Sequence, residues 1–198
     1  NMRIFSHLLE ETGWADSMVK YRDESYESLT EAEKNNKKGY SWQYNFPSPS
    51  HRYYGYTAFV EPDSIFVKKW GIPEPEVENG MVENWAEIMK AIKEKCENAY
   101  PDAVSSNLKS EDNAINEFVA YHLLNYRVPY NYLVYHLTEL GYYYRHPDQL
   151  TLDVWEYYVP MGKFKRVFKI TQSAKDGRMS INRHCKYDNS FLGDFHEI

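Results

Sequence analysis

The stretch that decides the predicted fold is FKRVFKIT (164–171), followed by DG (176–177) and RMSINRHCKY (178–187). An Asp-Gly pair favours a two-residue hairpin turn, because both residues tolerate the positive φ that this turn requires. The pattern therefore predicts a C-terminal β-hairpin. The predicted hairpin is basic, because most of the polar positions in these two segments are Lys or Arg.

Side chains alternate between the two faces of a strand. In the first predicted strand, one face carries Lys163, Lys165 and Lys169. In the second, one face carries Arg178, Ser180, Asn182, His184 and Lys186. If the register brings these two faces together, the hairpin presents a basic, hydrogen-bonding surface on which a phosphate can sit.

Helical periodicity precedes the hairpin. Apolar residues recur at spacings of three and four over 82–96, and Pro101 ends this helix. Ser110 is predicted to cap a second helix. Pro129 interrupts the pattern, and a third helix is predicted over 130–140. With three central helices and an antiparallel or mixed sheet, the predicted fold class is α+β.

The N-terminal part mixes both kinds of pattern. A short helix is predicted over 4–11, and Thr30 is a good cap for a helix that starts after it. Alternating or β-rich composition predicts strands over 52–60 and 64–70. These features predict a helix- and strand-rich N-terminal segment.

The run PEPE (73–76), followed by Asn79-Gly80, is typical of a linker. It is the candidate boundary between residues 1–80 and a helical, then β-sheet, domain over 81–198, although the two parts can equally form one continuous domain.

The composition indicates a globular, tyrosine-rich protein with 19 Tyr among its 198 residues. No apolar run approaches the roughly 20 residues needed to span a bilayer, so we expect no membrane partner. The two cysteines, Cys96 and Cys185, are too few for a disulfide scaffold and too distant for a Cys-x-x-Cys site. A reducing, cytoplasmic location is the simplest expectation.

Charge is distributed unevenly. The whole chain carries a net charge of −6, but residues 161–187 contain eight Lys or Arg and one acid, Asp176. A basic patch on an acidic body is typical of an anion site for a nucleotide or nucleic acid. A solvated strand face is the alternative interpretation.

Other candidate sites are weaker. His136 and Glu139 share a helix face, so metal-dependent hydrolysis through His122, His136 and Glu139 is a third hypothesis. The set lacks the His-Glu-x-x-His pattern of zinc peptidases, so we expect core or hydrogen-bonded histidines and no metal site. The segment 130–140 contains no Lys or Arg, so it is poorly suited to a DNA major groove. The run YYYR ending at Arg145 has the aromatic faces and the guanidinium that stack on bases.

The segments GRMSI (177–181) and KYDNSFLGDFHEI (186–198) resemble a late segment of the thymidylate synthase and pyrimidine hydroxymethylase superfamily. In that segment a strand is followed by Arg-Ser-x-Asp, Leu-Gly and then Pro-Phe-Asn or Pro-His-Asp. The resemblance covers about the last third of the chain. It implies a protein that binds a pyrimidine nucleotide, or a pyrimidine base in nucleic acid, and that forms a homo-oligomer.

The resemblance also implies roles for residues of the tail. Lys186 falls at the phosphate-binding arginine, Asn189 at the family's aspartate, and Glu197 at the residue that reads the pyrimidine edge. A carboxylate at Glu197 favours an exocyclic amino group, because it only accepts hydrogen bonds. His196 adds a hydrogen-bonding group, and Arg178 and Arg145 complete the predicted substrate-binding set.

Two departures from the family limit the predicted chemistry. The family's nucleophilic Cys follows a proline, whereas here Pro160 is followed by Met161, whose thioether cannot form a thiolate. Lys186 also lacks the bidentate geometry of an arginine. If the chain is an enzyme, the resemblance implies a pyrimidine nucleotide-modifying transferase without the usual Cys, and the sequence indicates no particular cofactor.

The alternative function is non-enzymatic. An acidic, tyrosine-rich surface is typical of an interaction or inhibitor protein, including those that phages encode, and its partner would be another protein.

Overall fold

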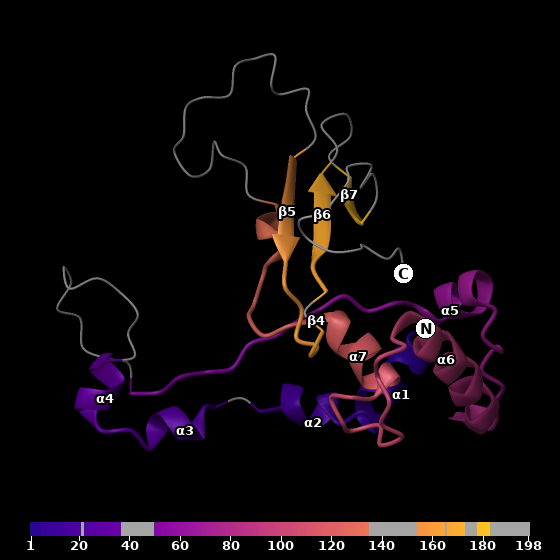
Figure 1. The fold of residues 1–198 in the computed structure, drawn as a ribbon, viewed down its shortest axis with the longest axis horizontal. Coiled ribbons are helices and arrows are strands. Elements are labelled where there is room, and N and C mark those ends of the chain that lie inside the picture. Colours follow the sequence, from indigo (N-terminus) through magenta and orange to yellow (C-terminus); the bar gives the residue numbers. More distant parts are fainter. Residues whose placement is uncertain (21, 37–49, 135–153, 165, 173–177, 183–198) are drawn as a thin grey trace, which may run out of the picture.

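The computed structural model describes residues 1–20, 22–36, 50–134, 154–164, 166–172 and 178–182 (Figure 1). Its helices are α1 (Arg3–Glu11), α2 (Trp14–Met18), α3 (Glu24–Glu27), α4 (Glu31–Asn36), α5 (Asp63–Trp70), α6 (Trp85–Ala99), α7 (Ala114–Tyr121) and the 3-10 helix η1 (Tyr130–Tyr132). Its strands are β1 (Thr57–Ala58), β2 (Val77–Glu78), β3 (Met81–Val82), β4 (Leu123–Leu124), β5 (Val154–Tyr158), β6 (Phe168–Gln172) and β7 (Met179–Ile181). The strand pairs within these described ranges are antiparallel, which confirms the α+β class.

Helices α1, α5, α6 and α7 form a body around one hydrophobic cluster (Figure 1). The predicted helices over 4–11 and 82–96 are confirmed as α1 and α6, because their apolar stripes face this cluster, but α6 begins at Trp85 and Val82 belongs to β3. The cluster takes side chains from both sides of residue 80, including Phe5, Phe66 and Phe118.

Helix α7 is the centre of the body, since every residue from Ala114 to Tyr121 is buried. The sequence predicted Ser110 as its cap, and this prediction is wrong. Asn113 is the N-cap, and its side-chain oxygen accepts hydrogen bonds from the backbone N–H groups of Ile115 and Asn116 at 2.9 and 3.2 Å. The carbonyl of Ser110 instead accepts from the N–H of Asn113 in the preceding turn.

The predicted strand over 64–70 is also wrong, because these residues form α5. Its β-branched and aromatic composition favours a strand, but tertiary contacts override this preference. The Asp63 carboxylate accepts the N–H of Ile4 at 3.0 Å, and Phe66 is buried in the core. Gly71 ends the helix with a φ of 68°, a left-handed conformation that suits glycine.

Two other N-terminal segments contain different elements from those predicted. Of the predicted strand over 52–60, only β1 is a strand, and it pairs with β4. The segment predicted as a linker contains the hairpin β2–β3, whose turn residues Asn79 and Gly80 both have positive φ, at 51° and 83°.

The three-stranded sheet has the order β5-β6-β7 and stands beside the helical body (Figure 1). Strands β6 and β7 confirm the C-terminal hairpin, with Thr171 opposite Ser180. Lys163 lies in the turn before β6 and not on the predicted strand face. Of the third predicted helix over 130–140, the described residues show only the 3-10 helix η1, residues 133–134 are not helical, and residues 135–140 lie outside the described part of the chain.

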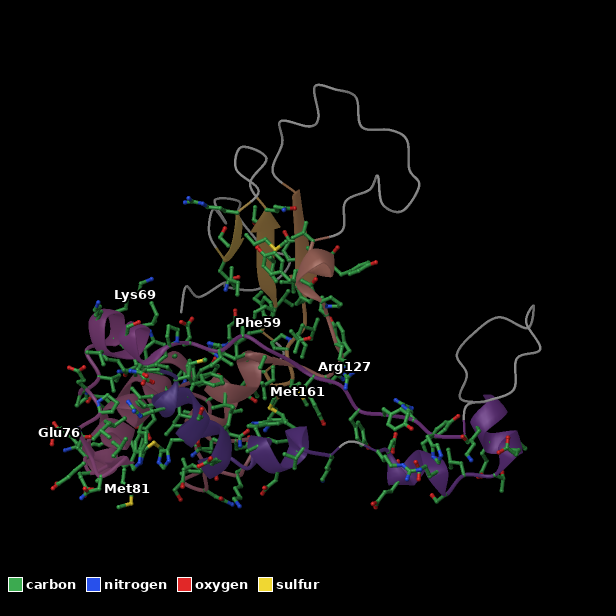
Figure 2. The ribbon with its side chains drawn as sticks, turned by 180° about the vertical axis from the view of Figure 1, so that it is seen from behind. Phe59, Lys69, Glu76, Met81, Arg127 and Met161 are labelled. Atoms are coloured by element: carbon green, nitrogen blue, oxygen red, sulfur yellow. The ribbon has the colours of Figure 1, made fainter. Side chains whose placement is uncertain are left out.

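Helices α3 and α4 lie on an extension that projects from the body in both views (Figures 1 and 2). The prediction for Thr30 is confirmed, because its hydroxyl accepts the N–H of Glu33 at 3.4 Å and its own N–H donates to the Glu33 carboxylate at 2.8 Å, as in a capping box. The two limbs of the extension are joined where the N–H of Asp23 donates to the carbonyl of Arg52 at 2.9 Å.

We expect His122 to make the stability of the protein depend on pH. Burial lowers the pKa of its imidazole from 6.5 to about 4. Between these values only the unfolded chain takes up the proton, so the free energy of unfolding falls as the pH is lowered, by on the order of 3 kcal/mol from this residue. The free energy of unfolding of His122→Gln, measured with urea between pH 7 and 4, should therefore decrease by about that much less than in the wild type.

His7→Gln is the matched control, because His7 stacks on Trp85 at the surface of α1. Its free energy of unfolding should decrease between pH 7 and 4 as much as that of the wild type. An equal pH dependence in the wild type and His122→Gln would contradict the assignment.

Glu117 should matter for stability because it joins α7 to the turn before β6. Its buried carboxylate accepts the N–H groups of Lys163 and Phe164. Glu117→Ala leaves these amides without their acceptor, so we expect a loss of about 1–3 kcal/mol in the free energy of unfolding. Glu94→Ala, on the exposed side of α6, is the control and should change the urea midpoint little.

Candidate functional site

An open groove lies between the loop after β4 and the strand β5. It has a volume of about 580 Å³, which is within the range of small-molecule sites. We call it the tyrosine groove, and its lining residues are Tyr126, Arg127, Val128, Pro129, Tyr132, Glu156, Tyr157 and Tyr158.

One wall of the groove is the loop 126–132. Thr57 of β1 holds this loop, because its hydroxyl donates to the carbonyl of Tyr126 and accepts the N–H of Val128, both at 2.8 Å. Thr57 therefore fixes the backbone on both sides of Arg127. Two chain segments that are distant in sequence therefore meet at this wall.

The other wall is β5. Tyr158 is buried, its ring stacks on Phe168 with 5.6 Å between ring centroids, and its hydroxyl donates to the carbonyl of Leu133 at 2.6 Å. Tyr157 lies on the opposite face of the strand and is 37% exposed. The groove therefore follows the outer edge of β5 and touches both faces of the strand.

Three tyrosine rings of the groove reach solvent. Tyr126 and Tyr132 are both 45% exposed, and Tyr157 lies beneath the ammonium of Lys169, which is 5.8 Å from the ring centroid. Exposed aromatic faces beside cations suit a planar, electron-poor ring that carries an anionic group.

Arg127 is the basic residue among those that line this groove (Figure 2). It lies directly over Gly55, where an added Cβ would come within 2.6 Å of its side chain. Within the described ranges, its guanidinium has neither an ion pair nor a hydrogen bond. A guanidinium without a protein partner is well suited to bind a phosphate or carboxylate.

Most residues of the sequence-predicted site fall outside the part of the chain that the structure describes. Lys186, Asn189, His196, Glu197 and Arg145 lie outside the described residues. Arg178 is exposed just before β7, at the edge of the sheet away from β5, and it does not line the tyrosine groove.

The basic and polar residues that were predicted to share one face of the hairpin have different surroundings in the structure. Lys163 forms an ion pair with Asp112, whose hydrogen bond raises the pKa of the lysine. Arg166 lies over the ring of Tyr100, at 4.3 Å from its centroid. The register places Asn182 opposite Lys169, but Asn182 is buried and donates to the hydroxyl of Tyr121 at 3.0 Å.

The metal interpretation gains no support from the part of the chain that is described, where no three His, Cys, Asp or Glu side chains are grouped to hold an ion. His122 is buried and hydrogen-bonded to the carbonyl of Phe118 at 2.8 Å. His136 and Glu139 lie outside the described residues. No described helix is long and apolar enough to cross a membrane.

Sequence reasoning missed Arg127 and Glu156. The signal for both was the density of tyrosines around them, in YRVPYNY (126–132) and WEYY (155–158). Nothing in either segment alone indicates that the two are neighbours.

Comparisons with known proteins found no family model, no curated protein and no solved structure that matches this chain.

Proposed function

We propose that this protein binds a pyrimidine nucleotide in the tyrosine groove, with the base against a tyrosine ring and the phosphate on Arg127. The observation that carries the proposal is a guanidinium without a described protein partner among four tyrosines. Aromatic faces stack on bases, and an arginine binds phosphate through two parallel hydrogen bonds.

The choice of a pyrimidine comes from the resemblance of the tail to the thymidylate synthase and pyrimidine hydroxymethylase superfamily. Met161 stands where that family has its nucleophile, and its side chain packs against the helical core. Its N–H donates to the carbonyls of Ala120 and Leu123 at 3.2 and 2.9 Å. The proposed activity is therefore binding, without covalent attack on the ring by a cysteine at this position.

Arg127→Ala tests the groove. We expect it to weaken the binding of a pyrimidine mononucleotide by roughly tenfold or more, because a charged hydrogen bond to the phosphate is lost. Isothermal titration calorimetry with dUMP, dCMP and their 5-substituted forms measures the change. Arg3→Ala, which removes another exposed arginine of the body, is the matched control and should bind like the wild type.

Lys186→Ala distinguishes the groove from the tail, because the sequence resemblance assigns the phosphate to Lys186. Loss of binding in Lys186→Ala together with full binding in Arg127→Ala would place the nucleotide at the tail instead. If none of these nucleotides binds the wild type, nucleotide binding itself is wrong.

The projecting extension supports a second candidate, a non-enzymatic interaction protein (Figure 1). Tyr53 and Tyr54 on its returning limb are 51% and 36% exposed. A stoichiometric protein partner that is lost in the double variant Tyr53→Ala and Tyr54→Ala, while nucleotide binding is unchanged, would support this function.

A further inference from the structure

We infer that Glu156 is the residue that determines base specificity in the tyrosine groove, and that it selects a base with an exocyclic amino group over one with a carbonyl at the same position. This inference rests on the proposed nucleotide binding. It adds the chemical class of the base and assigns a role to a residue that the sequence did not single out.

The backbone groups of Tyr157 in β5 point away from β6. Both backbone groups of Lys169 in β6 point to β7, because its N–H donates to Asn182 Oδ1 at 2.9 Å and its carbonyl accepts the N–H of Asn182 at 2.8 Å. Tyr157 is opposite Lys169, so the two form a non-hydrogen-bonded pair. The N–H of Tyr157 therefore points to the outer edge of β5.

The Glu156 carboxylate meets this N–H. The N–H of Tyr157 donates to Glu156 Oε1 at 3.1 Å. This bond folds the Glu156 side chain back along the outer edge of β5, where it lines the groove. One carboxylate oxygen is thus held by the backbone, while the other has no partner within the described ranges.

The groove holds one residue of each charge, Arg127 and Glu156. Glu156 and Arg127 line the same groove but do not form an ion pair. The groove therefore presents a cation at Arg127 and an anion at Glu156, and each can bind a different group of one ligand. A nucleotide with a phosphate and an amino-substituted base carries complementary groups at its two ends.

The hydrogen-bonding properties of the Glu156 carboxylate determine which base the groove prefers. An ionised carboxylate only accepts hydrogen bonds, so it pairs with an amino group and is repelled by the lone pairs of a carbonyl. The cytosine ring has an amino group where the uracil ring has a carbonyl. Cytosine is therefore the pyrimidine that fits this groove.

The test compares dCMP with dUMP by isothermal titration calorimetry on the whole chain. We expect the wild type to bind dCMP roughly tenfold or more tightly than dUMP. Glu156→Gln should bring the ratio of the two affinities close to one, because an amide can either donate or accept. It should still bind nucleotide, since the phosphate contact of Arg127 is unchanged.

Glu197→Gln is the matched comparison, because the sequence resemblance assigns base reading to that carboxylate. The inference would be overturned if the ratio of the affinities for dCMP and dUMP fell to about one in Glu197→Gln and stayed unchanged in Glu156→Gln. Equal binding of dCMP and dUMP by the wild type would also overturn it, while leaving nucleotide binding intact. If neither nucleotide binds, the inference fails together with the proposed function.

Discussion

The complete burial of α7 is the constraint on which the rest of the structure depends. A buried polar group must find a partner inside the protein, and this helix end carries Glu117, Tyr121 and His122. Glu117 accepts the amides of the turn before β6, and Tyr121 accepts a hydrogen bond from Asn182. The carbonyl of His122 accepts the N–H of Phe59 beside β1. The same helix thus joins the two hydrophobic clusters of the protein.

These connections also set the geometry of the tyrosine groove. Asn182 is held at the end of β7 with a φ of 55°, and both of its hydrogen bonds to Lys169 follow from that position. They determine which backbone groups of β5 face outward. Thr57, next to Phe59, holds the opposite wall. The groove is therefore built by hydrogen bonds from strands that the buried helix keeps in place.

Local patterns predicted the features that depend on local physics. The apolar stripes of α1 and α6 recur with the helical period, and the Thr30 cap has its acidic partner three residues later. The antiparallel pairing of β6 and β7 confirms the predicted hairpin, whose predicted turn at Asp176-Gly177 lies outside the described residues. The strand predicted over 64–70 failed because the contacts of α5 with α1 and the core outweigh its β-rich composition.

The sequence by itself determined the α+β class, the two periodic helices and the abundance of tyrosine and basic residues near the C-terminal end. It could not determine the candidate groove, because its walls come from segments more than twenty residues apart. Their meeting depends on strand register and on the partners that buried side chains require. These are long-range properties, so only the tertiary structure decided that Arg127 and Glu156 line one site.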